Sequence, residues 1–501
     1  MFAIVNYKKL NNSELKNKSF LGVTWNIIGK LSTQIVTFIV SIFLARLLSL
    51  SDFGLVAMAM VFISVSQAFM DFGLTTALIQ KKSPSVVQIN TTFYINLILA
   101  VVLTVLMISC SGLIGCFYKN DEIGEIIRVV SLLFIVYAAT GVQRAMLTKQ
   151  LKIKTLTISN LVGAFVQGAL GIWLAFNDYG AWSLVYSNIA GSLVTCVMLW
   201  LQSSWRPRLM FQLSEIKELF NFGYKLFFSK LLDSIYVKLD ELIIGRLFNS
   251  DTLGAYSRSK SFNHMIVSYT SDSLGGVFFP VISHIQNDVE QIKRVVVKSL
   301  ETISFLVFLL IALLYLDAES LIVILFGEKW LVSVEYFKIL AFMAYGFPVS
   351  AILVNTLLGM GHSGKFLKLE IWKKVIGLSG MFVGFLWGIY GYLWATVVTT
   401  AIGVTFNMFF VSKVIPLKIS EQWKILIKYA LISLGCVIPV WLLNQVLPHN
   451  LWLILIVDTL LFSVLYIIVN LSIKTNGFLL LKNIIISKNI GTRLFKFKKG
   501  K

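Results

Sequence analysis

The segment 219–256, LFNFGYKLFFSKLLDSIYVKLDELIIGRLFNSDTLGAY, is long enough to cross a membrane as a helix, yet it is rich in charge. Charged side chains lie between its apolar residues, among them Lys225, Lys230, Asp233, Lys238, Asp240 and Glu241. A charge at the centre of a bilayer costs at least ~2.5–3.5 kcal/mol, so such residues normally face a bundle interior or a water-filled cavity. The segment therefore predicts a helix with one polar face.

The spacing of the polar residues supports this interpretation. One stripe recurs every three or four residues and contains Asn221, Lys225, Ser229, Asp233, Tyr236 and Asp240. A neighbouring set widens the stripe and contains Lys230, Ser234, Lys238 and Glu241. A soluble amphipathic helix has the same pattern, so the class of protein has to come from the rest of the chain.

The composition is that of a polytopic membrane protein. The 501 residues are 57% hydrophobic and 14% charged, with a mean hydropathy of +0.82, whereas soluble proteins are about 25% charged. A net charge of +20 would suggest nucleic acid as a partner of a soluble protein, but here Lys and Arg gather in alternate loops. The four cysteines show no metal-ligand spacing. We therefore expect no nucleic-acid partner, metal, cofactor or disulfide framework.

Apolar runs of about 20 residues match the thickness of a bilayer core. We expect about fourteen of them to be transmembrane helices, and we expect kinks at Pro280, Pro348 and Pro439. The expected spans are 20–48, 55–80, 89–117, 124–147, 156–176, 181–203, 219–249, 255–284, 295–316, 334–360, 370–388, 391–412, 424–446 and 451–473.

Basic residues predict the orientation of these spans. With the N-terminus inside, 33 of the 44 Lys and Arg residues, Arg144 among them, fall in cytoplasmic segments and eight fall outside. Residues 1–18 are expected to be a cytoplasmic leader because no signal-peptide cleavage site follows the first apolar residues. Residues 474–501 are expected to be a basic cytoplasmic tail, so both termini are predicted to be cytoplasmic.

An internal repeat divides the chain. LARLLSLSDFGLVAMA (44–59) aligns with IGRLFNSDTLGAYSRS (244–259) at an offset of 200, which matches Gly54 to Gly254. Tyr179-Gly180 falls opposite Tyr390-Gly391, at an offset of 211. Because each half has an even number of crossings, the two halves share one orientation and are expected to enclose a central cavity.

The repeat predicts the domain organisation of an all-α membrane protein. The expected parts are a six-helix half at 19–203, a cytoplasmic linker at 204–218, a second six-helix half at 219–413, and two additional helices in 424–473. Carried back by 200 residues, Lys230 falls on Lys30, the one charge embedded in the first span when Arg46 is counted with the outer turn. Lys30 belongs to a polar stripe of its own, so we expect both lysines to face the cavity.

These patterns define the candidate site. We expect a cationic cavity for an anionic headgroup, formed by Lys30, Lys230, Asp233, Lys225, Lys238, Asn26, Gln34 and Tyr236. The acids assigned to ion coupling or charge pairing are Asp71, Asp272 and Asp240. The alternative is purely structural ion pairing of Lys30 with Asp71 and of Lys230 with Asp272 or Asp233. Glu301 and Asp458 are isolated acids, for which we expect either snorkelling to the membrane interface or a local hydrogen bond.

Several motifs resemble a known family: LARLLSLSDFGLVAMA, FMDFGLTTALIQ, QRAMLTKQLKIK and LFGEKWLVSVEYFKIL. From about residue 18 to 470 the chain is similar to the polysaccharide-transporter branch of the multidrug/oligosaccharidyl-lipid/polysaccharide (MOP) flippases, and most of all to Wzx-type exporters of the colanic-acid kind. The resemblance implies a MATE-like fold. It also assigns Lys30, Lys230 and Asp233 to the handling of an anionic lipid-linked sugar. The turn SLSDFG departs from the family by lacking a proline often found there.

The activity implied by the resemblance is export of undecaprenyl-pyrophosphate-linked oligosaccharide repeat units, for O-antigen, capsule or exopolysaccharide, across the bacterial inner membrane. It also implies alternating access, ion coupling, and partnership with the bilayer and with polysaccharide polymerase and chain-length machinery. Two other classes stay open. A membrane enzyme would need a reactive constellation such as a histidine pair, and we find none. A drug or cation antiporter of the same superfamily would favour acidic cavity residues over two symmetric lysines.

Overall fold

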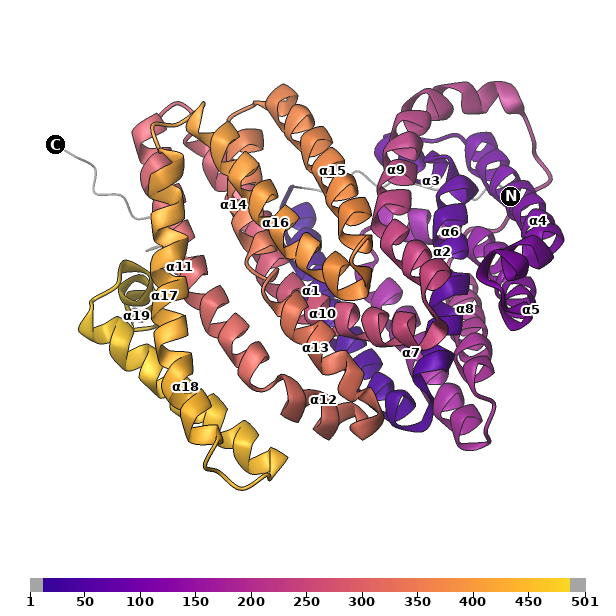
Figure 1. The fold of residues 1–501 in the computed structure, drawn as a ribbon. Helices are drawn as coiled ribbons and strands as arrows, with labels where there is room; N and C mark the ends of the chain where they lie inside the picture. Colours follow the sequence, from indigo (N-terminus) through magenta and orange to yellow (C-terminus); the bar gives the residue numbers. More distant parts are fainter. Residues whose placement is uncertain (1–11, 487–501) are drawn as a thin grey trace. The chain divides into compact units, whose positions relative to one another are not determined.

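The protein consists of α-helices joined by short turns. The computed structural model describes residues 12–486, and that range contains α-helices, two short 3-10 segments and no β-strand (Figure 1). The chain divides into two compact units, residues 1–254 and 255–501. The all-helical membrane fold predicted from the sequence is confirmed.

The N-terminal unit holds α1 to α9 and the first turn of α10. Residues 12–18 of the expected leader belong to α1, whereas residues 1–11 lie outside the described range. The bounds are α1 Asn12–Leu47, α2 Leu50–Asp71, α3 Leu74–Gln80, α4 Val86–Tyr118, α5 Asp121–Val130, α6 Leu133–Lys149, α7 Ile153–Phe176, α8 Ala181–Gln202, η1 Leu213–Ile216 and α9 Lys217–Leu247.

Two helix starts in this unit follow directly from the sequence. Ser49 accepts a hydrogen bond from the backbone N–H of Asp52, and the Asp52 carboxylate accepts one from the backbone N–H of Ser49 at 2.8 Å. Ser85 and Gln88 form the same reciprocal capping box at the start of α4. Each box satisfies two backbone donors that a helix N-terminus would otherwise leave free, so α2 and α4 begin at defined residues.

Three of the expected spans are interrupted. The span 55–80 breaks after α2, where Phe72 and Gly73 adopt left-handed backbone angles. The span 124–147 is divided into α5 and α6, and the span 334–360 into α13 and α14. The last two are the fourth spans of their predicted halves, so corresponding helices are broken in both. Pro348 is the third residue of α14, where it starts a helical segment instead of bending a continuous one.

The C-terminal unit holds most of α10 and all later helices. The bounds are α10 Ser250–His284, α11 Val289–Leu316, α12 Ala318–Phe326, η2 Glu328–Trp330, α13 Leu331–Ala341, α14 Gly346–Gly359, α15 Ser363–Phe385, α16 Gly388–Ser412, α17 Ile419–Asn444, α18 Leu451–Ser472 and α19 Asn476–Ile486. Pro280 and Pro439 lie inside α10 and α17. The helix α19 falls within the expected tail 474–501 and packs against α11.

Helix α11 is central to the C-terminal unit. One of its faces packs with α14 and α16 around Val296, Ile352 and Met408. The other packs with α17 and α18 around Phe305, Tyr429 and Tyr466. The two acids that are isolated in the sequence make hydrogen bonds in the structure: Glu301 accepts one from Asn476 at 2.9 Å, and Asp458 accepts one from Asn444 at 2.8 Å.

The described residues contain eleven helical stretches that are long and apolar enough to cross a membrane. The expected spans 219–249, 255–284 and 370–388 correspond to α9, α10 and α15, which are helical but are not among these eleven. Fourteen crossings therefore stay a prediction. The outer faces of the long helices are apolar, as α18 illustrates with Ile456, Leu460 and Val464 all more than half exposed. A soluble monomer rarely exposes such a continuous apolar surface, whereas lipid covers it at no cost.

Candidate functional site

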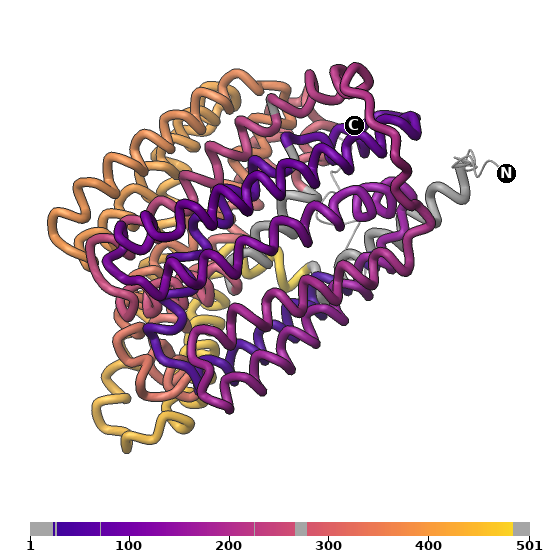
Figure 2. The backbone as a smooth tube through the Cα atoms, turned by 90° about the vertical axis from the view of Figure 1, so that its right-hand side faces the viewer, coloured from indigo at the N-terminus to yellow at the C-terminus, as the bar shows by residue number. Residues whose placement is uncertain are grey.

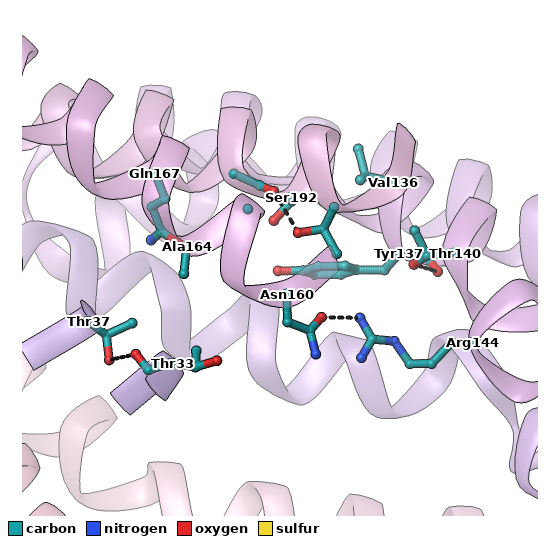
Figure 3. Close-up of a pocket in the computed structure, with 13 residues that line it drawn as sticks. Thr33, Thr37, Val136, Tyr137, Thr140, Arg144, Asn160, Ala164, Gln167 and Ser192 are labelled. Carbon is teal, nitrogen blue, oxygen red and sulfur yellow. Dashed lines mark hydrogen bonds between the residues drawn. The ribbon is translucent and has the colours of Figure 1, made fainter. Parts of the chain in front are cut away.

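A polar cavity lies inside the N-terminal unit, among α1, α6, α7 and α8 (Figure 3). Its volume is about 240 Å³. The lining residues are Thr33, Thr37, Val136, Tyr137, Thr140, Arg144, Asn160, Gly163, Ala164, Gln167, Gly191, Ser192 and Thr195. Most of these side chains carry a hydroxyl, amide or charged group, although they belong to helices that are otherwise apolar.

Small residues bring the walls of the cavity together. The helices α1, α7 and α8 run alongside one another (Figure 2). A Cβ atom at Gly163 would stand 2.8 Å from the carbonyl oxygen of Gly191, and one at Gly168 would stand 2.2 Å from the Val40 side chain. Small residues at such crossings allow membrane helices to pack closely without a hydrophobic driving force. The close packing of α7 on α1 and α8 therefore fixes the position of the side chains that line the cavity.

Arg144 supplies the positive charge of the cavity. Its Nη2 donates a hydrogen bond to Asn160 Oδ1 at 3.2 Å, and Figure 3 shows the two side chains pointing toward each other. The guanidinium has five donors in a planar fork, so one bond to Asn160 leaves others for a ligand. Asn160 also holds the fork in place, and such preorganised donors match carboxylate and phosphate groups.

The threonine hydroxyls of the cavity are turned toward their own helices. Thr37 donates to the carbonyl oxygen of Thr33 at 2.9 Å, Thr140 to that of Tyr137 at 2.9 Å, and Thr195 to that of Gly191 at 2.9 Å. A hydroxyl has two lone pairs in addition to its proton, so these oxygens can still accept hydrogen bonds. Together with Arg144 and Gln167 they offer both donors and acceptors, which suits a ligand with many hydroxyl groups.

The charged helix α9 packs chiefly on α2 and α3. Ser234 Oγ donates to the carbonyl oxygen of Ser64 at 3.1 Å, and Gly223 lies against the backbone of Gly73 at the α2–α3 break. The stripe that contains Ser234 therefore faces α2. Along it, Lys238 Nζ forms an ion pair with Glu241 Oε2 at 2.7 Å. Lys238, expected in the cavity, is thus paired within its own helix.

The other predicted site residues have different surroundings. Lys30, Lys230 and Asp233 are exposed, Gln34 and Tyr236 are half-buried, and Asp240 is buried with an oxygen that accepts the backbone N–H of Glu241 at 2.8 Å. Lys30 lies one turn before Thr33 on the same face of α1, which puts it and Gln34 beside the cavity. The side chains of Asn26, Asp71, Lys225 and Asp272 lie outside the described residues.

The core of this cavity was not predicted from the sequence. The sequence predicts Arg144 only as one of the cytoplasmic basic residues, and the structure adds that it belongs to α6 and lines the cavity. A periodic signal was present in two spans: Tyr137, Thr140 and Arg144 recur at helical spacing, and Asn160 and Gln167 are seven residues apart. The convergence of Lys30 and Lys230 on one axis stays a prediction.

Comparison with known proteins gives the family context. A family model described as "Polysaccharide biosynthesis protein" matches residues 43–335. The lipopolysaccharide biosynthesis protein WzxC of Escherichia coli (strain K12) is 23% identical over 399 residues, which cover 77% of this chain and 80% of that protein. The teichuronic acid biosynthesis protein TuaB of Bacillus subtilis (strain 168) is 24% identical over 325 residues, which cover 64% and 67% of the two chains.

Several solved structures share the fold, and two of them illustrate it. The lipid II flippase MurJ in an inward closed conformation matches with a TM-score of 0.73 at 13% identity, over 93% of this chain and all of that one. An inward-facing multidrug resistance MATE family transporter of the MOP superfamily matches with a TM-score of 0.60 at 13% identity, over 76% and 95%. The MATE-like fold implied by the resemblance is thereby confirmed.

Proposed function

Because the chain belongs to the polysaccharide biosynthesis protein family, we propose that it is a flippase for lipid-linked oligosaccharides. Its substrate is an undecaprenyl-pyrophosphate-linked repeat unit of an O-antigen, capsule or exopolysaccharide. The protein carries this unit across the bacterial inner membrane by alternating access. The names of the relatives support the proposal, since they include a succinoglycan biosynthesis transport protein, ExoT of Rhizobium meliloti (strain 1021).

The observation that carries the proposal is the polar cavity beside Arg144. A sugar stripped of water loses a hydrogen bond at every hydroxyl, at a cost of about 1–3 kcal/mol for each group left unpaired. Hydroxyl and amide side chains in the cavity replace those bonds. Arg144 and the neighbouring Lys30 place positive charge beside them. An apolar tail does not fit such a lining, so the cavity takes the sugar and its anionic group while the lipid stays in the bilayer.

The exposed lysines Lys30 and Lys230 are assigned to the pyrophosphate. An ammonium on a flexible stem is a point charge with rotatable donors, so it can follow a phosphate that moves during the cycle. Arg144, which Asn160 holds in place, suits a fixed part of the headgroup instead. The exposed Asp233 and the buried Asp240 are the described candidates for an exchanging proton or sodium ion.

The antiporter alternative is disfavoured by the charge of the cavity. A carrier of organic cations needs acidic groups where its substrate binds, whereas the charged residue that lines this cavity is Arg144. We also propose that the protein is no enzyme, that both termini are cytoplasmic, and that it works with polysaccharide polymerase and chain-length machinery.

Complementation of a bacterium that lacks its own flippase tests the function. We expect expression of the chain to restore the surface polymer and to clear the lipid-linked repeat units that accumulate inside. The same cells yield inverted vesicles for uptake of a labelled organic cation. Cation uptake without glycan restoration would identify an antiporter instead. Failure of both assays in strains with several different repeat units would rule the proposal out.

A further inference from the structure

Two acidic side chains are buried next to each other in the C-terminal unit, where α11 ends against the hairpin of α17 and α18 (Figure 1). Asp317 directly follows α11 and is 3% exposed, and Asp458 lies inside α18 and is fully buried. Thr459 Oγ1 donates a hydrogen bond to Asp317 Oδ2 at 3.0 Å, and Asn444 Nδ2 donates one to Asp458 Oδ2 at 2.8 Å. These four residues form one polar cluster, named here the Asp317–Asp458 cluster.

Three oxygen atoms of this cluster lack a hydrogen-bond donor. They are Oδ1 of Asp317, Oδ1 of Asn444 and Oδ1 of Asp458, and all three are buried. Apolar residues such as Val440 and Phe462 lie one helical turn from Asn444 and Asp458. Buried polar atoms in proteins are nearly always paired, so three unpaired acceptors in one place need an explanation.

The charge of the cluster is also uncompensated. Within the described residues, no ion pair joins Asp317 or Asp458 to a Lys, Arg or His side chain. Two carboxylates away from water are costly unless a positive charge lies between them. One proton shared by two oxygens would still leave the third acceptor unpaired. A small cation held between the two carboxylates would supply both the missing positive charge and a partner for their unpaired oxygens.

We infer that the Asp317–Asp458 cluster is a binding site for a small alkali cation of the size of Na⁺. Its ligands would be two carboxylates, one amide oxygen and one hydroxyl, a set of hard oxygen donors that suits hard cations. The described residues contain no group of three or more His, Cys, Asp or Glu side chains, so a transition-metal site is not the better match. The bound cation connects the end of α11 to α17 and α18.

A proton competes for the same site. Burial raises the pKa of the Asp317 carboxyl to about 7, and the nearby Asp458 raises this pKa further, while the hydrogen bond from Thr459 lowers it. Asp317 lies between α11 and α12, outside the candidate spans.

Binding of ²²Na⁺ to the purified full-length chain in nanodiscs tests the inference without any transport assay. We expect saturable binding that unlabelled NaCl displaces and choline chloride does not. Removing one charged ligand should lower the affinity for Na⁺ roughly ten- to a hundredfold. We expect this lower affinity in both Asp317→Asn and Asp458→Asn. The control is Glu319→Gln, which removes an exposed acid two residues from Asp317 and should bind Na⁺ like the unmodified chain.

The thermal unfolding midpoint of the same samples provides the second measurement. A ligand that binds only the folded state raises the midpoint as its concentration rises. We expect Na⁺ to do so at constant ionic strength for the unmodified chain and for Glu319→Gln, and not for Asp317→Asn. If Asp458→Asn fails to fold, Asp317→Asn and Asn444→Ala decide the matter. Unchanged ²²Na⁺ binding in both would overturn the inference, and so would stabilisation by low pH alone with no response to Na⁺.

Discussion

Gly54 packs directly against the backbone of Ser250, so that a Cβ atom at position 54 would stand 1.9 Å from the Ser250 carbonyl oxygen. The contact is reciprocal, because a Cβ atom at Gly254 would stand 1.9 Å from the carbonyl oxygen of Leu50. The two pairs are related by the offset of 200 residues that relates the sequence repeats. Reciprocal contacts of this kind are typical of a two-fold relationship, here between the first turns of α2 and α10.

This close approach predicts that alanine is harmful at both glycines. Backbone atoms cannot move aside as a flexible side chain can, so Gly54→Ala and Gly254→Ala should each cost about 1–3 kcal/mol of folding stability. The matched control is Gly112→Ala in α4, because nothing lies within 4 Å of a Cβ atom there. Fluorescence-detected gel filtration after heating should show an earlier loss of folded protein for the first two variants. Equal behaviour of all three would refute the contact.

Arg144 is predicted to be needed for export and dispensable for folding. Arg144→Ala should lower the surface polymer at least tenfold in the complementation assay, because the cavity loses its fixed donors, and Arg144→Lys should restore only part of it. Arg208→Ala is the control, since the exposed Arg208 lies outside the cavity. Its backbone N–H donates to Asn90 Oδ1 at 2.6 Å and its carbonyl oxygen accepts from the Met210 N–H at 2.7 Å, and alanine keeps both bonds. Normal export by Arg144→Ala would remove the cavity from the mechanism.

The lysines of the charged stripes are predicted to fall into two groups. Lys30→Ala and Lys230→Ala change exposed side chains, so the amount of folded protein should be unchanged while export falls. Lys238→Ala removes the ion pair of the buried Glu241 carboxylate, so folded protein should decrease. The double variant with Glu241→Gln should recover it. Loss of folded protein in Lys30→Ala and Lys230→Ala would favour the structural ion-pair alternative.

The orientation can be measured with single cysteines in a background from which Cys110, Cys116, Cys196 and Cys436 have been removed. Helix α7 has 24 residues and so spans about 36 Å, which puts its two ends on opposite sides of a bilayer core. A cysteine at Asp178 should react with an impermeant thiol reagent applied from outside, and one at Lys152 should not. His449 and Lys368 form the corresponding pair in the C-terminal unit. Reversed labelling of that second pair alone would reveal an error in the count of spans.

Stability without Na⁺ is predicted to fall as the pH rises from about 4 to about 7. The pKa of Asp317 is raised by burial from 3.8 to about 7, so the folded chain binds more protons than the unfolded chain in this range. The free energy of unfolding therefore falls as the pH rises through this range. Asp317→Asn should flatten this part of the profile of thermal midpoint against pH, measured in choline chloride. If Asp317→Asn and the unmodified chain give the same profile, Asp317 titrates near its ordinary pKa.

The sequence by itself determined the class of protein and the positions of its helices. An apolar run has to become a helix in a bilayer, because no water is present there to satisfy its backbone groups. Every expected span therefore has helical counterparts in the structure, and reciprocal caps such as Ser49 with Asp52 could be read from adjacent residues. The offset of 200 residues likewise predicted which glycines correspond, because a repeat preserves its turn residues.

The tertiary structure decided which polar residues meet. Arg144 and Asn160 lie on different helices, and their hydrogen bond depends on how closely α7 packs on its neighbours, which hydropathy does not encode. Asp317 and Thr459 are joined across 142 positions, so neither acid of the Asp317–Asp458 cluster was predicted to have an acidic neighbour. The interruption of two spans between α5 and α6 and between α13 and α14 has the same origin. Helix breaks inside a bilayer persist where neighbouring helices satisfy the freed backbone groups, and those neighbours come from distant parts of the chain.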